Sequence, residues 1–126
     1  MIAANVLSAE KVQRLSLIQV IANPETWDGK KVLVIGYLDL TFEGSELYVH
    51  QEDLEHHLLM NGVRIRASAA KQYTGKINHK YVLIVGQFHA APKEVFHPAL
   101  GTIDSITEYR IWLGSEKETG DKARSA

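Results

Sequence analysis

The chain has 126 residues, of which 45% are hydrophobic and 23% are charged, as in an ordinary globular domain rather than a disordered or fibrous chain. It contains no cysteine, which excludes a disulfide framework, a thiol nucleophile and a cysteine zinc site. Its formal net charge of −1 lacks the basic excess that is typical of domains bound to phosphate backbones. The apolar start Met1–Leu7 has no basic leader, and no apolar run approaches the ~20 residues of a membrane span. We therefore expect a cytoplasmic protein that does not enter a membrane.

The first predicted element is a short helix that begins near Ser16. Ser16 and Gln19 have the spacing of a capping box and precede apolar residues at helical intervals. The helix should end at Asn23, because a residue that precedes proline is pushed out of the helical region. Upstream, residues 1–15 are an N-terminal arm or a helical turn, and the pattern leaves both alternatives open.

Five later segments have the composition of strands. Lys31–Leu40 follows an Asp-Gly turn signal, and Gly36 and Gly86 each interrupt an apolar run at a point where a barrel strand would bend. Between the second and third strands, Gln51–Leu59 is predicted as a short amphipathic helix or a helical turn. The predicted strands are Lys31–Leu40, Glu46–His50, Val63–Ala67, His79–His89 and Leu100–Trp112.

Five strands, with glycine in the first and the fourth, correspond to the plan of an OB-fold. We predict a mainly β protein: a five-stranded OB-like barrel over residues 16–113, with a short N-terminal helix and one or two further short helices. The polar tail, residues 114–126, is expected to be disordered.

The chain also resembles a group of small bacterial OB-fold-like domains. The resemblance covers residues 16–112 and is strongest before residue 54. It implies the fold and a bacterial setting, and it carries no established active site. Because small domains of this style occur beside toxin genes, it also implies by analogy an immunity protein that neutralises a toxin. The matching segments are Leu17–Glu25, Asp28–Val32, Ile35–Leu38, Phe42–Gly44, Leu47–Tyr48 and His50–Asp53.

Histidines and carboxylates crowd into the segment from His50 to His57, which raises the question of a metal site. His56 and His57 are adjacent and would point about 100° apart on a helix, whereas helical metal motifs place two ligands four residues apart. No serine lies in the Gly-x-Ser-x-Gly pattern of a nucleophile elbow. We therefore expect no metal, no cofactor and no catalytic residue, and a metal-dependent hydrolase is the weaker alternative.

Arg64 and Arg66 lie on one face of a predicted strand, where with Phe42 and Tyr48 they could form the cationic and aromatic surface that OB-folds use on single strands. The acidic segment Glu52–Glu55 would repel phosphate but would suit a partner of mixed charge. The first hypothesis is therefore a non-enzymatic module that binds a protein, most concretely a cognate toxin. Binding of single-stranded nucleic acid is the alternative, and pairing of the arginines with Glu46 or Glu52 is the structural explanation of the same residues. The predicted partner-binding residues are Phe42, Tyr48, Glu52, Asp53, Glu55, Arg64 and Arg66.

Overall fold

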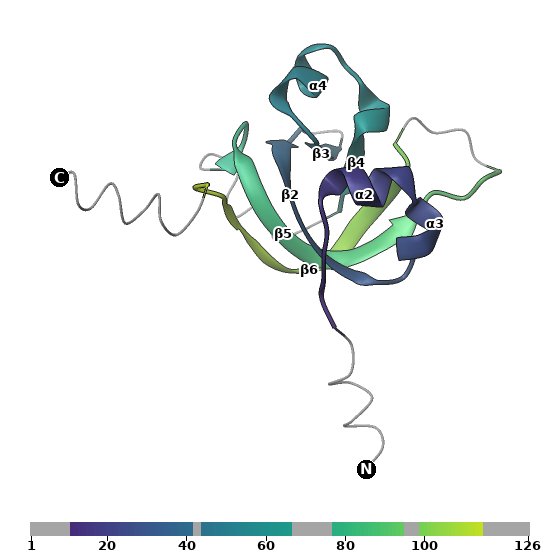
Figure 1. Ribbon diagram of the computed structural model, residues 1–126. Coiled ribbons are helices and arrows are strands. Elements are labelled where there is room, and N and C mark those ends of the chain that lie inside the picture. The colour runs from purple at the N-terminus through teal and green to yellow at the C-terminus, as the bar shows by residue number, and fades with distance from the viewer. Residues whose placement is uncertain (1–10, 42–43, 67–76, 95–98, 115–126) are drawn as a thin grey trace.

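The computed structural model describes residues 11–41, 44–66, 77–94 and 99–114 (Figure 1). Within these ranges no helix is long and apolar enough to cross a membrane. The helical elements are α2 (Leu17–Ala22), α3 (Pro24–Trp27), α4 (Gln51–Glu55) and the 3-10 turn η1 (Leu59–Asn61). The strands of the described chain are β1 (Gln13–Arg14), β2 (Lys31–Asp39), β3 (Ser45–Tyr48), β4 (Gly62–Ile65), β5 (Tyr81–Ala90) and β6 (Gly101–Ile111).

Strands β2 to β6 close into a barrel. The sheet runs in the order β1-β2-β3-β4-β6-β5, and β2 also pairs with β5, which closes β2, β3, β4, β6 and β5 into a ring, with β1 paired to β2. The β4–β6 pairing is parallel, whereas β2–β3, β3–β4, β5–β6 and β2–β5 are antiparallel. This closed, five-stranded barrel with a few short helices confirms the predicted mainly β, OB-like fold.

Both predicted glycine interruptions lie where another strand approaches closely; at Gly86 a Cβ atom would lie 2.7 Å from the carbonyl oxygen of Asp104. At Gly86 the β5–β6 register shifts between Val85 and Gln87, so the glycine lies at an irregularity of the barrel wall. At Gly36, a Cβ atom would lie 2.6 Å from the carbonyl oxygen of Tyr48 and 2.7 Å from Leu47 Cγ. Gly36 is therefore required because β3 packs directly over it.

The barrel encloses a core that is fully buried, and α2 covers part of its surface. The capping box of α2 is confirmed, because Gln19 N donates to Ser16 Oγ at 3.1 Å and Ser16 N donates to Gln19 Oε1 at 2.9 Å. The helix ends at Asn23 as predicted, but Pro24 then begins α3, a position at which proline is favoured. Fully buried core residues include Val20, Val32, Val34, Leu38, Leu47, Val63, Val82, Ile84, Phe88 and Ile103.

Some predicted elements differ from the structure or fall outside it. Gln13 and Arg14, where a helical turn was one of two alternatives, form a short strand parallel to β2. The helix predicted over Gln51–Leu59 is divided into α4 and η1. The polar tail and Phe42 lie outside the described residues, and so does most of the polar segment between the third and fourth predicted strands.

Candidate functional site

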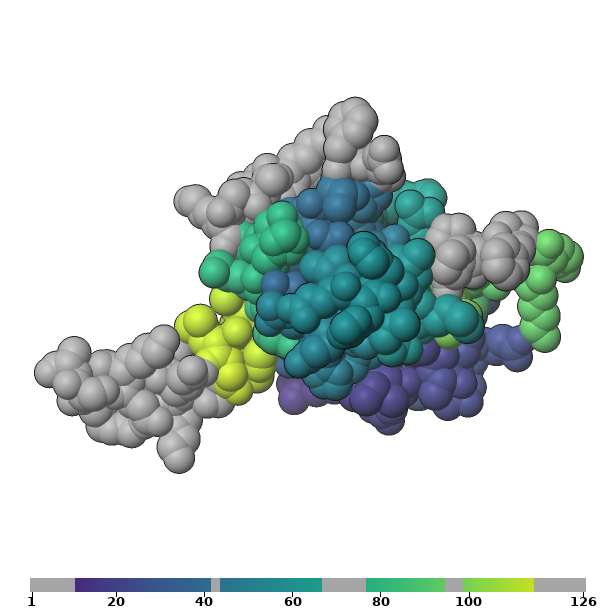
Figure 2. Space-filling model, turned by 90° about the horizontal axis from the view of Figure 1, so that it is seen from above, coloured from purple at the N-terminus to yellow at the C-terminus, as the bar shows by residue number. Residues whose placement is uncertain are grey.

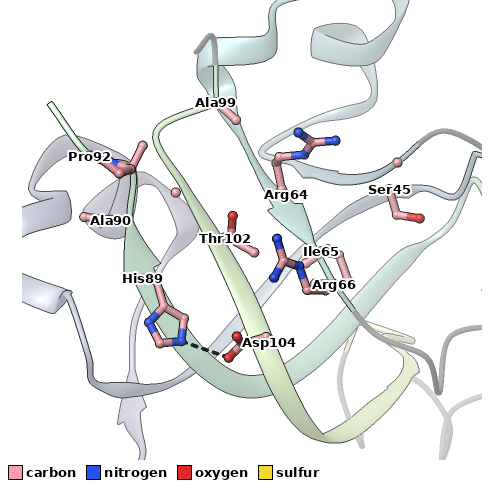
Figure 3. Close-up of a pocket in the computed structure, with 13 residues that line it drawn as sticks. Ser45, Arg64, Ile65, Arg66, His89, Ala90, Pro92, Ala99, Thr102 and Asp104 are labelled. Carbon is pink, nitrogen blue, oxygen red and sulfur yellow. Dashed lines mark hydrogen bonds and ion pairs between the residues drawn. The ribbon is translucent and has the colours of Figure 1, made fainter. Parts of the chain in front are cut away.

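A groove of about 610 Å³ lies on the outside of the barrel, over β4 and β6 (Figure 3). One of its edges follows the β2–β3 connection, and another follows the chain that leaves β5. OB-folds bind oligonucleotides and oligosaccharides on the face of their second and third strands, which are β3 and β4 here, and at the connections that correspond to β2–β3 and β5–β6. The groove shares β4 and residues of both connections with that region. We call this hollow the barrel groove; it is lined by Gly44, Ser45, Arg64, Ile65, Arg66, His89, Ala90, Ala91, Pro92, Ala99, Gly101, Thr102 and Asp104.

Arg64 contributes a charge to the groove from the middle of β4. It lies opposite Glu46 in the β3–β4 pairing, and its Nε is 3.7 Å from Glu46 Oε2. This ion pair confirms one of the two pairings expected from the sequence, the one with Glu46. The Arg64 side chain is 39% exposed and that of Glu46 only 14%, so the arginine reaches solvent while the carboxylate stays in the wall.

Burial controls the protonation of Glu46. Removal of the carboxylate from water raises its pKa to about 7, although the positive charge of Arg64 acts in the opposite direction. The second carboxylate oxygen, Oε1, is buried and has no hydrogen-bond partner among the described residues. Glu46 is therefore a titratable group in the wall beside one of the groove's arginines.

Arg66 and a histidine–carboxylate pair complete the polar lining. Arg66 N donates to the carbonyl oxygen of Ile103 at 2.9 Å, which ties the end of β4 to β6 and leaves the side chain exposed. His89 Nε2 lies 2.9 Å from Asp104 Oδ1 across the β5–β6 pair (Figure 3). The sequence did not indicate His89, Thr102 or Asp104 as site residues, because the parallel β4–β6 pairing that brings them to Arg64 has no local signal.

The acidic segment predicted beside the arginines lies elsewhere. None of Glu52, Asp53 and Glu55 lines the groove, as far as the described chain defines it. Their helix α4 instead approaches β5, where Gln51 N donates to the hydroxyl oxygen of Tyr81 at 3.1 Å. The acidic part of the predicted mixed-charge surface is therefore not part of the groove.

Two of the predicted partner-binding residues are buried. Asp53 is 7% exposed, and its carboxylate accepts hydrogen bonds from His50 N at 2.8 Å and from Asn61 Nδ2 at 2.9 Å. Tyr48 is 2% exposed, with its ring against Gly62, where a Cβ atom would lie 3.1 Å from Tyr48 Cδ1. The assignment of Tyr48 and Asp53 to an exposed face is wrong, because one ring packs over a glycine and one carboxylate caps a helix.

The histidine-rich segment does not form a metal site within the described chain. His50 precedes α4, and its backbone nitrogen is held by Asp53, while His56 and His57 are exposed at the end of the same helix. In the part of the chain that the structure describes, no group of three or more histidines, aspartates and glutamates is placed to hold an ion.

A smaller hollow of about 300 Å³ lies between α2 and the chain around α4. Figure 2, viewed from above, shows the chain of α4 and η1 in teal beside the purple and blue chain of α2 and α3. Ile18, 58% exposed, stands at this hollow, which is mainly apolar. Its lining residues are Ile18, Ile21, Ala22, Val49, His50, Asp53 and Asn61.

The strand order and the position of the groove define the class of protein as an OB-fold-like barrel. No protein-family model matches the chain, and no curated protein matches it. A solved structure that it resembles is a chain of the Stn1-Ten1 complex of S. pombe, with 14% sequence identity and a TM-score of 0.48. The match covers 93% of this chain and 91% of that chain. None of these comparisons supports the predicted bacterial setting or the immunity role.

Proposed function

We propose that the chain is a non-enzymatic binding module that holds single-stranded nucleic acid in the barrel groove, with backbone phosphates at Arg64 and Arg66. The observation that carries this proposal is the placement of both arginines in one groove on the outside of an OB-like barrel. The groove also includes β4 and parts of the two connections with which OB-folds bind oligonucleotides, and it extends over β6.

Among the described residues, the groove is lined by two arginines and by one carboxylate, Asp104, which pairs with His89. The main objection from the sequence was repulsion by Glu52–Glu55, and this segment does not line the groove. Arginine suits phosphate because its planar guanidinium offers several donors in a fixed geometry. Because the whole chain has a net charge of −1, the attraction is local to this groove and should involve few phosphates.

The apolar part of the lining offers a surface for the bases. Ala90, Ala91 and Pro92 stand in the same groove as the arginines, so a strand can place its phosphates on the charged side and its bases on the apolar side. Such contacts do not read base edges, and we expect binding with weak sequence preference.

The test is a titration of the purified chain against a fluorescent single-stranded oligonucleotide of mixed sequence at several salt concentrations. Two phosphate contacts should give log K against log salt a slope of about −1.4. The double variant Arg64→Gln, Arg66→Gln should lose most of the affinity and most of this slope. Arg110→Gln is the matched control, because Arg110 is exposed on β6, pairs with Glu108 at 2.8 Å and does not line the groove.

Absence of binding at low salt, or equal loss in the Arg110→Gln control, would overturn the proposal. The protein-partner hypothesis, including toxin neutralisation, would then be the one to pursue. It has less support, because the acidic segment of the predicted mixed-charge surface does not line the groove of Arg64 and Arg66.

A further inference from the structure

We infer that Glu46 is a positioning residue for Arg64: its carboxylate holds the guanidinium against the barrel wall, and protonation of that carboxylate releases Arg64 to a bound phosphate. Affinity for nucleic acid is then coupled to proton uptake at this one side chain. The inference rests on the proposed function, because it concerns the regulation of the same groove.

The register of the barrel places the interacting groups in one row. Asp39 on β2 lies opposite Glu46 on β3, and Glu46 lies opposite Arg64 on β4. Side chains at directly paired positions project to the same side of a sheet, so this row runs along the outside of the barrel into the groove. Arg64 also lies back over the β2–β3 connection, since a Cβ atom at Gly44 would be 2.5 Å from its Nη2. The guanidinium is thus held near Glu46, at the edge of the groove.

Burial and two described charged groups, Arg64 and Asp39, determine the charge of Glu46. Arg64 favours the carboxylate, whereas Asp39 on the neighbouring strand and burial in the wall both favour the neutral acid. Asp39 is itself 3.0 Å from His79 Nε2. On the same strand, burial raises the pKa of Tyr48 to about 12, and the negative charge of Glu46 acts in the same direction. Since burial outweighs the other effects, the pKa of Glu46 is raised to about 7.

The charged and the neutral form of Glu46 affect phosphate binding at Arg64 differently. The carboxylate competes with the ligand for Arg64 and repels the ligand's negative charge. The neutral acid does neither, and it also removes the cost of burying a charged group whose Oε1 has no hydrogen-bond partner among the described residues. By linkage, a phosphate that prefers neutral Glu46 must raise its pKa, and binding must take up at most one proton at this site.

The experiment measures affinity for the same oligonucleotide at pH 6 and pH 8 in constant salt. The wild type should bind roughly fivefold more tightly at pH 6, the upper range for a partly exposed ion pair. Glu46→Gln should bind with the tighter affinity at both pH values. His89→Gln is the control, because it removes the imidazole that lies in the same groove and leaves Glu46 in place. We expect it to keep the pH dependence.

A second measurement needs no ligand. Because the folded-state pKa of Glu46 is raised, the folded chain binds more protons than the unfolded chain between about pH 4.5 and 7. The stability of the wild type should therefore decline as the pH rises through this range, and Glu46→Gln should decline less. Failure of all variants to bind at either pH would refute the proposed function. Oligonucleotide binding whose pH dependence survives in Glu46→Gln, or disappears in His89→Gln, would refute the role of Glu46 alone.

Discussion

Charged residues near the two ends of strand β4 have different roles: one is buried and stabilises the fold, and the others line the groove. At the start of β4, the carboxylate of Asp53 is buried and accepts two hydrogen bonds within the α4–η1 connection. Toward the other end, Arg64 and Arg66 extend into the barrel groove (Figure 3). At about 3.3 Å per residue, these two arginines lie about 7 and 13 Å along the strand from Gly62. Asp53 is thus part of the folded core of the domain, whereas Arg64 and Arg66, later in the chain, belong to the proposed binding surface.

The charged side chains around α4 should affect stability and not binding. Asp53→Ala removes a buried acceptor of two hydrogen bonds and should lower the free energy of unfolding by about 3 kcal/mol. Its neighbour Glu52 is exposed, and Glu52→Ala should change stability by less than about 0.5 kcal/mol. Denaturant unfolding measures both effects. If Asp53→Ala is as stable as Glu52→Ala, the hydrogen bonds of the Asp53 carboxylate do not stabilise the fold.

The close approach of β2 and β3 holds one edge of the groove in place. Gly36→Val should lower the free energy of unfolding by about 1–3 kcal/mol, because the added atoms meet the Tyr48 carbonyl group and Leu47. Thermal unfolding checks this, and Ile35→Val at the half-buried neighbouring position serves as the control for the change of side chain in β2. An unchanged melting temperature in Gly36→Val would show that β3 does not pack over this glycine.

The fold was predictable because its signals are local. Ser16 and Gln19 lie three residues apart, Asp28-Gly29 marks a turn in which Gly29 has a φ of +82°, and the apolar runs of β2 and β5 each contain an interrupting glycine. These features depend on neighbours in the chain, so a single sequence contains them.

The site was predictable only in part. Alternation along β4 identified Arg64 and Arg66, and cross-strand reasoning suggested the partner Glu46. The sequence also predicted Tyr48 as an exposed binding residue. Tyr48 is buried, because Gly62, 14 positions later, leaves room for its ring. His89 and Asp104 reach the groove through pairings between distant strands, and nothing in their own sequence neighbourhoods predicts that position.

The most direct test measures the smallest expected effect. A short single-stranded oligonucleotide is added to the ¹⁵N-labelled chain, and the NMR chemical shifts of the backbone amides are followed. We expect the amides of Arg64, Arg66 and Thr102 to shift as binding saturates, while those of Glu52, Glu55 and His56 on and after α4 stay in place. Saturable shifts at Glu52, Glu55 and His56, with none at the groove, would contradict the assignment of the binding surface to β4 and β6.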